Sequence, residues 1–362
     1  MPQRPLSGLL VLDASRMLPG AVLVRQLVDL GARVIKIEAP GSGDLMRHAP
    51  PLVDGIGAGF AAFFRGVESI TLDLREEAGR EAVRTIAARA DVFIESFRPG
   101  TLDRWGLGPD ALRQANPRLV TCSLPGFGSD TPQAQHVAHD LNLVAQSGLL
   151  ALIGGHVPGT QLADVSTGLL ACSAILAALL LRDRTGAGMH VEQPLASGPV
   201  PFLTWPRADA AAGGAGLRET LLSGQSPSYQ VYRCADGRQV ALGAVEPKFW
   251  LEFVQAIGLP ELAGEGMAFG EAGAAAIAKL AAKFAGAPSP HWLALAEQHN
   301  WPLTLVQTPR ESLEDPTYAR ADGTYAAWPT STNPVPALGA DTERVFAEFG
   351  VASRSGASGS GV

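Results

Sequence analysis

At roughly 100–200 residues per domain, the 362 residues of the chain are enough for two or three domains. Hydrophobic residues make up 46% and charged residues 17% of the chain, a composition that excludes an intrinsically disordered protein. The net charge is −7 and no basic block occurs, so nucleic-acid binding is excluded as the main activity and no nucleic-acid partner is expected.

The three cysteines, Cys122, Cys172 and Cys234, lie far apart and form no CxxC pair. Such a set is typical of reduced thiols in the cytoplasm, and it predicts neither a disulfide framework nor a metal site. The N-terminus has no apolar signal core, and the most apolar run, 169–181, is short of the roughly 20 residues that span a bilayer. We therefore expect a cytoplasmic protein with no membrane partner.

Short apolar runs alternate with helical patterns through the first third of the chain. Strands are predicted at 9–12, 34–37, 69–74, 92–94 and 119–123, and helices at 21–30, 78–90 and 109–115. Such alternation is typical of a parallel sheet that is covered by helices on both faces. Because sheets of this kind bind ligands at the carboxyl ends of their strands, the loops of interest are 13–20, 95–104 and 124–128.

A nicotinamide dinucleotide enzyme is the first hypothesis that this pattern suggests. Glu38 ends the second strand, where an acidic residue would bind the ribose. The first loop, however, reads DASRMLPG at 13–20 and lacks the GxGxxG pattern that lets the backbone approach a pyrophosphate. The sequence therefore argues against a dehydrogenase.

The second half of the chain has a different organisation. A long apolar helix is predicted at 165–181, and the Pro/Gly/Ala-rich stretch 196–224 is interpreted as a linker. A hairpin with an Asp-Gly turn follows at 229–234 and 239–243, with helices predicted at 247–257, 274–284 and 291–299. These elements predict a smaller α+β domain over 225–304. The Ser/Gly-rich end, 351–362, is expected to be disordered.

Asp164 lies just ahead of the predicted apolar helix. One interpretation is a helix N-cap, a position at which Asp is favoured. The other is functional, because a helix N-terminus keeps a partly buried carboxylate ionised, and such a carboxylate is a competent base or nucleophile.

Three further features allow both a structural and a functional interpretation. His139 precedes a second apolar helix, and Glu246 lies between the hairpin and the helix that starts at Pro247. Arg98 and Arg104 flank a Pro-Gly turn that follows a strand, where guanidinium groups would suit phosphate. Taken singly, each is more often a capping or surface residue.

Taken together, the motifs resemble CoA-transferase family III, the CaiB/BaiF family, which also contains the α-methylacyl-CoA racemases. The segments that carry the resemblance are PLSGL at 5–9, LGARVIKIEAPGSGD at 30–44, ITLDL at 70–74, IESFRPG at 94–100, RWGLG at 104–108, NPRLV at 116–120 and GFG at 126–128. The resemblance extends over roughly residues 5–345.

This resemblance implies an α/β fold with a Rossmann-like, CoA-binding large domain made from both ends of the chain, at 1–195 and 305–350. The smaller α+β domain is inserted between these two segments. It also implies that two chains interlock as a homodimer.

The resemblance further implies an enzyme that acts on an acyl-CoA substrate. Coenzyme A is then part of the substrate, and no tightly bound cofactor or metal is expected. In the transferases, an aspartate that aligns with Asp164 attacks the thioester, and an aspartyl-CoA thioester results. The racemases use the same aspartate as an acid/base and add a histidine and a glutamate, which align with His139 and Glu246. The residues implied in CoA binding are Glu95, Phe97, Arg98, Arg104, Ala138 and Asp140.

Both additional racemase residues are present, which favours proton transfer at the α-carbon over CoA transfer between carboxylic acids. The departures from the family pattern include Ala39, at the position of a CoA-contacting arginine. Glu68 and Leu143 stand where the family has a cation and an aromatic residue. The arginines that could replace the lost phosphate contact are Arg16, Arg47 and Arg65. These departures leave open a third hypothesis, a non-catalytic acyl-CoA binder.

Overall fold

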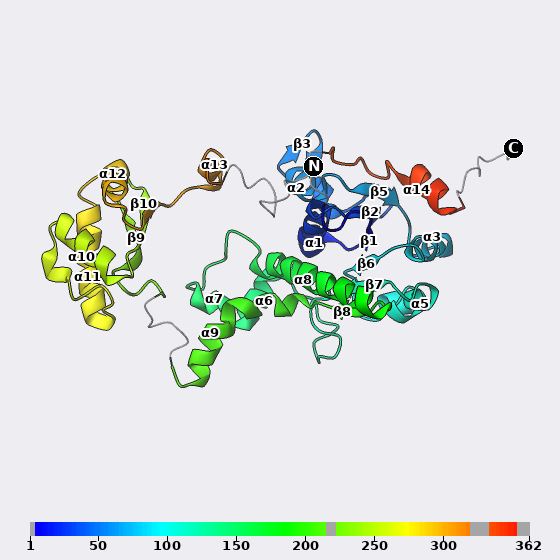
Figure 1. Ribbon diagram of the computed structural model, residues 1–362, viewed down its shortest axis with the longest axis horizontal. Coiled ribbons are helices and arrows are strands. Elements are labelled where there is room, and N and C mark those ends of the chain that lie inside the picture. Colours follow the sequence, from blue (N-terminus) through cyan, green and yellow to red (C-terminus); the bar gives the residue numbers. More distant parts are fainter. Residues whose placement is uncertain (1–3, 215–221, 319–332, 353–362) are drawn as a thin grey trace. The chain divides into compact units, whose positions relative to one another are not determined.

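The computed structural model describes residues 4–214, 222–318 and 333–352 (Figure 1). The chain forms two compact units, Met1–Pro201 with Arg320–Val362, and Phe202–Ala319. We refer to them as unit 1 and unit 2. The chain leaves unit 2 after residue 319 and not near 305, because Leu303–Leu305 still pairs within the unit 2 sheet. The tail predicted to be disordered lies, from residue 353 onward, outside the described residues.

Unit 1 is built around a six-stranded sheet in which every neighbouring pair is parallel. The strands run in the order β5-β2-β1-β6-β7-β8, with the bounds β1 Leu10–Ala14, β2 Arg33–Glu38, β5 Glu68–Thr71, β6 Val92–Glu95, β7 Val120–Ser123 and β8 His190–Glu192. The predicted α/β class is confirmed. Edge strand β8 was not predicted, because its three residues carry a single apolar side chain and show no alternation.

Helices cover both faces of this sheet (Figure 1). One face packs against α1 Met17–Asp29, α2 Ala58–Phe64 and α8 Leu162–Thr185. The other packs against α3 Glu77–Ala87, α5 Pro109–Ala115 and α14 Thr342–Phe349. Alternate residues of β1 face the two layers: Val11 joins the first core, whereas Leu10 and Leu12 join the second.

Helix α8 begins earlier than predicted, and this places Asp164 inside its first turn instead of ahead of it. The helix packs closely on α1: a Cβ at Gly168 would lie 2.7 Å from the Pro19 carbonyl oxygen and 2.7 Å from the Val22 Cβ. Within the described residues, α8 is the one helix long and apolar enough to cross a membrane by length and composition, and 44% of its most apolar window is buried in the fold.

Unit 2 contains a three-stranded antiparallel sheet with the order β11-β10-β9. Its elements are β9 Tyr229–Arg233, β10 Gln239–Gly243, β11 Leu303–Leu305, α10 Pro247–Ala256, α11 Gly270–Phe284 and α12 Ser289–His299. The predicted hairpin is therefore confirmed. Its core is aromatic: the Tyr232 and Phe284 rings stack at 4.8 Å, and Phe253 packs edge-on against Trp301 at 5.2 Å.

The stretch 196–224, expected as a linker, contains helix α9 at Val200–Ala211. The linker interpretation was wrong there, because it rested on a Pro/Gly/Ala-rich composition without clear periodicity. Pro201 lies in the first turn, where a missing N–H costs nothing, and Pro206 is tolerated in the interior of the helix.

The remaining short elements are 3-10 helices Leu45–His48, Leu195–Ser197 and Pro260–Leu262, strands β3 Leu52–Val53 and β4 Ile56–Gly57, and helices α4 Thr101–Arg104, α6 Asp140–Ser147, α7 Leu149–Leu152 and α13 Pro309–Ser312.

Candidate functional site

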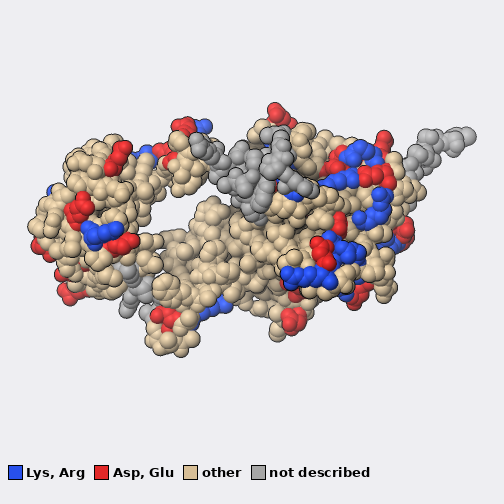
Figure 2. Space-filling view, viewed as in Figure 1, with Lys and Arg blue, Asp and Glu red and all other residues tan. Residues whose placement is uncertain are grey.

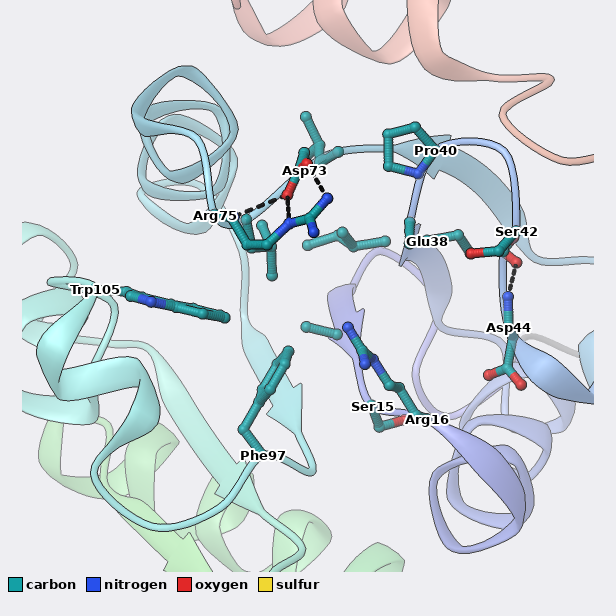
Figure 3. A pocket seen from close by; sticks show the side chains of 16 residues that line it. Ser15, Arg16, Glu38, Pro40, Ser42, Asp44, Asp73, Arg75, Phe97 and Trp105 are labelled. Atoms are coloured by element: carbon teal, nitrogen blue, oxygen red, sulfur yellow. Dashed lines mark hydrogen bonds and ion pairs between the residues drawn. The ribbon is translucent and has the colours of Figure 1, made fainter.

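A cleft of about 540 Å³ opens at the carboxyl ends of β1, β2, β5 and β6 (Figure 3). The strand order reverses between β1 and β6, and α/β sheets bind ligands in the crevice at such a point. The observed cleft is therefore where the alternation of strands and helices predicted a ligand.

Two aromatic rings and two arginines shape this cleft. The Phe97 and Trp105 rings meet edge to face at 5.5 Å, and the guanidinium of Arg16 lies 5.1 Å from the Phe97 ring centre. Arg75 donates from Nε and Nη2 to the Asp73 carboxylate at 2.9 and 2.6 Å. Arg16 makes no ion pair with any residue in the described part of the chain, so its charge is available to an anionic ligand.

Two residues that line the cleft, Glu38 and Asp44, belong to buried ion pairs. Lys36 is 1% exposed, and its Nζ lies 3.2 Å from both the Asp13 and the Asp44 carboxylates. Arg47 donates to both oxygens of Glu38 at 2.6 and 2.7 Å. Glu38 is therefore already paired, which agrees with the rejection of a ribose-binding role.

Of the three arginines considered as replacement phosphate ligands, Arg16 alone lines the cleft. Arg47 is committed to Glu38, and Arg65 donates from Nη1 to the Asn333 carbonyl oxygen at 3.4 Å. Trp105 and Arg75 were not singled out from the sequence, although the position of Arg75 just after a strand end is the signal that could have found it.

The turn after β6 holds most of the residues that the resemblance implied in CoA binding. Phe97 lines both the large cleft and a second cavity of about 160 Å³, which Glu95 and Arg98 also line. The Glu95 carboxylate accepts the Phe97 N–H at 2.6 Å, and burial raises the pKa of Glu95 to about 7. Arg104 lines neither cavity and donates from Nη2 to the Thr101 hydroxyl at 3.2 Å.

The structure brings together three other predicted site residues. Asp164 lies in the first turn of α8, and its backbone N–H donates to Asp140 Oδ1 at 3.0 Å. Asp140 begins α6, and His139 is the residue that caps this helix; the His139 N–H donates to Asn142 Oδ1 at 3.0 Å. Ala138 precedes this group and is half-buried. The contact between α6 and α8 thus gathers His139, Asp140 and Asp164.

The charge environment of Asp164 differs from that of an ordinary surface carboxylate. Burial, followed by the negative charge of Asp140, raises the pKa of Asp164 to about 6, and His139 opposes part of this shift. A carboxyl group with a pKa near neutrality can take up and release a proton under physiological conditions. Asp164 caps no helix with its side chain, because Gln161 is the N-cap of α8.

Glu246 belongs to unit 2, where it is exposed and is the N-cap residue of α10. The cap makes no side-chain hydrogen bond to the helix. Within the described residues, no group of three or more His, Cys, Asp or Glu side chains could hold a metal ion.

Comparisons of the sequence and of the structure with known proteins find relatives from the same family. The model of CoA-transferase family III matches residues 6–352. An acetyl-CoA:oxalate CoA-transferase of Acetobacter aceti is 33% identical over 83% of this chain and 80% of its own. The α-methylacyl-CoA racemase of Homo sapiens is 34% identical over 70% of this chain and 65% of its own. The crystal structure of a CAIB/BAIF family protein from Brucella suis has a TM-score of 0.83 at 30% identity, and covers 96% of this chain and 100% of its own.

Proposed function

The chain belongs to CoA-transferase family III and is an enzyme of the CoA-transferase and racemase kind, and on this basis we propose that it moves a proton at the α-carbon of an acyl-CoA thioester. The observation that supports the proposal is the raised pKa of Asp164, about 6, in a first turn of α8 that is tied to Asp140, the chain neighbour of His139. Inversion at the α-carbon by proton delivery to the opposite face uses two proton carriers, whereas acyl transfer uses one carboxylate nucleophile.

In the proposed reaction, one of the two side chains removes the α-proton, and the electron pair of the C–H bond passes into the thioester carbonyl to give an enolate. The other side chain then donates a proton to the opposite face of the α-carbon. No covalent bond to the enzyme forms, and the product is the other enantiomer of the same thioester. Glu246 is proposed to take part in the proton transfer as the third acid/base residue of the racemase pattern.

The cleft at the carboxyl ends of the strands is proposed to bind the nucleotide end of the acyl-CoA. Its aromatic rings, Phe97 and Trp105, suit a purine base, and Arg16 and Arg75 suit phosphate groups. The second cavity, with Glu95 and Arg98, extends the binding surface along the same sheet edge.

Replacing Arg16 by Ala is expected to raise the dissociation constant of CoA by at least about tenfold, because a charge-assisted hydrogen bond to phosphate contributes ~1.5–3 kcal/mol. The fold should persist, since the Arg16 contact to Ser96 is made by its backbone N–H. Calorimetric titration with CoA measures the effect. Arg118→Ala, a change at an exposed arginine paired with Asp183, is the control. Equal affinities in all three proteins would refute the nucleotide assignment.

A CoA transferase is the second candidate, and the observation in its favour is that the Acetobacter aceti transferase aligns over more of both chains than the racemase does. Incubation with an acyl-CoA in deuterated water separates the two reactions. Deuterium at the α-carbon without an added carboxylic acid supports α-proton transfer. CoA transfer that appears only when an acceptor acid is added, with no α-deuteration, supports the transferase instead.

A homodimer is proposed from an apolar stripe on α8. Leu169 and Leu180 are 42% and 56% exposed, and they lie on one helix face with the exposed residues Ser173 and Ala177. Charged side chains gather over the α3 and α14 end of unit 1 and are few over the start of α8 (Figure 2). Exposed apolar stripes of this kind usually mark an interface.

The double variant Leu169→Glu/Leu180→Glu is therefore expected to convert a dimer into a monomer, because a buried interface would have to accommodate four carboxylates without partners. Light scattering after size-exclusion chromatography measures the mass. Leu141→Glu, at another exposed leucine (39%) on α6, tests how far the interface extends. A wild-type monomer, or a double variant that stays dimeric, would contradict the proposal.

A cytoplasmic location is proposed as well. The cysteines Cys122, Cys172 and Cys234 are all free and buried, as expected of thiols in a reducing compartment. Subcellular fractionation with the native chain tests this assignment.

A further inference from the structure

The loop between β1 and α1 carries Arg16 and is held on both sides of this residue. The Ser15 N–H donates to Asp13 Oδ1 at 2.9 Å. The Met17 N–H donates to Asp44 Oδ2 at 3.4 Å. Met17 has a φ of 63°, a backbone conformation that residues other than glycine rarely adopt and that persists only where the surrounding structure imposes it. The two carboxylates therefore fix the course of this loop.

A buried lysine joins these two carboxylates. Lys36 Nζ lies 3.2 Å from both the Asp13 and the Asp44 carboxylates. The same Nζ donates to the Ser15 carbonyl oxygen at 3.0 Å, so the three contacts use the three donors of the ammonium group. Lys36 is 1% exposed and does not line the cleft. Its charge therefore acts on the loop and does not reach a ligand directly.

The direction of the Arg16 side chain depends on this loop. Its guanidinium makes no ion pair within the described residues, and it lies 5.1 Å from the Phe97 ring centre (Figure 3). We propose that Lys36 and Asp44 are positioning residues, which fix the backbone of the β1–α1 loop so that the Arg16 guanidinium meets a phosphate group in the cleft. The inference rests on the proposed nucleotide-binding role of the cleft, and all of these residues belong to unit 1.

Asp44→Asn tests this role with a minimal change in volume. Asp44 Oδ1 also accepts the Met46 N–H at 2.9 Å, and the Asn side chain keeps an oxygen for this contact. The other terminal atom becomes an amide nitrogen, which cannot accept from the Met17 N–H or from Lys36. We expect the dissociation constant of CoA to rise about three- to tenfold, because ordering one long side chain lowers affinity by about this factor.

The sign of the change separates positioning from a direct effect on the ligand. Asp44 itself lines the cleft. A carboxylate that acted directly on CoA would repel its phosphate groups, and its removal would tighten binding. Positioning predicts the opposite, so a lower dissociation constant in Asp44→Asn would contradict the inference.

A double-mutant cycle shows whether the effect passes through Arg16. In the Arg16→Ala background, Asp44→Asn should change the dissociation constant of CoA by less than about twofold, because the side chain that it positions is already absent. The same fold-change in both backgrounds would overturn the inference. In turnover of an acyl-CoA, Asp44→Asn should raise KM and leave kcat within about twofold, as expected for a loss of uniform binding. A fall in kcat at unchanged KM would also count against it.

The matched control is Asp29→Asn. Asp29 is 0% exposed and pairs with Arg25 at 2.6 Å, at the opposite end of α1 from the cleft. This change should lower the unfolding temperature and leave CoA binding unchanged, which separates a loss of stability from a loss of positioning. Lys36→Met leaves two buried carboxylates without their cation, so it is compared only where thermal unfolding shows a folded protein. There it should weaken CoA binding at least as much as Asp44→Asn does.

Calorimetric titration with CoA gives all of these affinities, and it is independent of which reaction the enzyme catalyses. Weaker binding in Arg16→Ala but not in Asp44→Asn overturns the inference and leaves the nucleotide assignment intact. Equal affinities in Arg16→Ala and the wild type refute the nucleotide assignment, and the inference fails with it.

Discussion

Asp164→Asn is expected to lower the rate of α-proton exchange by at least about 100-fold for the enantiomer whose α-proton Asp164 removes, because general acid–base catalysis contributes ~10²–10⁴-fold. The substitution keeps the size of the side chain and removes its ability to ionise. The backbone N–H that donates to Asp140 Oδ1 is unaffected, so the contact between α6 and α8 should persist. Deuterium incorporation into an acyl-CoA measures the loss.

The matched control is Asp183→Asn, a change at a carboxylate on the same helix that is 63% exposed and paired with Arg118. It should retain the wild-type rate. Near-full exchange from both enantiomers in Asp164→Asn would show that the carboxylate is not a proton carrier.

The raised pKa of Asp164 also predicts a gain in stability for the Asn variant. Below pH 3.8 the carboxyl is protonated in both the folded and the unfolded chain, and no penalty exists. As the pH rises from 3.8 to about 6, the unfolded chain ionises first, and the folded state loses stability relative to it. At pH 7 the full shift corresponds to ~3 kcal/mol, and solvent screening of this half-buried carboxylate lowers the loss to about 1–2 kcal/mol. Asp164→Asn should therefore unfold at a higher urea concentration than the wild type at pH 7, and the two should converge near pH 4.

The same pKa sets the pH dependence of the reaction. For the enantiomer whose α-proton Asp164 removes, kcat/KM should rise about tenfold per pH unit up to about pH 6 and then level off, because only the ionised carboxylate is a base. The residual activity of Asp164→Asn should not show this rise of kcat/KM with pH.

His139→Gln is expected to abolish exchange from one enantiomer of a 2-methylacyl-CoA and to leave measurable exchange from the other. Gln cannot take up a proton, whereas an imidazole takes up and returns one near neutral pH. The helix cap should survive, because the His139 contact to Asn142 is made by the backbone N–H. The control is His291→Gln, at an exposed histidine on α12. Equal losses from both enantiomers would point to a positioning role for His139 instead of proton transfer.

How far the sequence predicts the fold depends on the length of each element. The α/β class followed from alternating apolar runs, and the hairpin β9–β10 followed from its Asp-Gly turn. β8 and β11 were missed, because strands of three residues carry no periodicity and are held by their neighbours in the sheet. The boundary near 305 was misplaced for the same reason, since β11 was not seen.

Asp164, His139 and Glu246 were named from the family resemblance, and their roles stay predictions. No local pattern shows that Asp140 accepts the N–H of Asp164, because this contact depends on how α6 packs against α8. Arg47 is likewise ruled out as a phosphate ligand only by the folded structure, because both of its hydrogen bonds to Glu38 form when the loop after β2 folds. A charged residue in a sequence does not reveal whether a buried partner already uses its charge.

The most direct test of the proposed function is deuterium incorporation at the α-carbon of each enantiomer of a 2-methylacyl-CoA, with the wild-type enzyme in deuterated water and no acceptor acid. α-Proton transfer predicts that deuterium enters from both enantiomers and that both converge on the same racemic mixture. The absence of deuterium from both, with CoA transfer once a carboxylic acid is added, would contradict it.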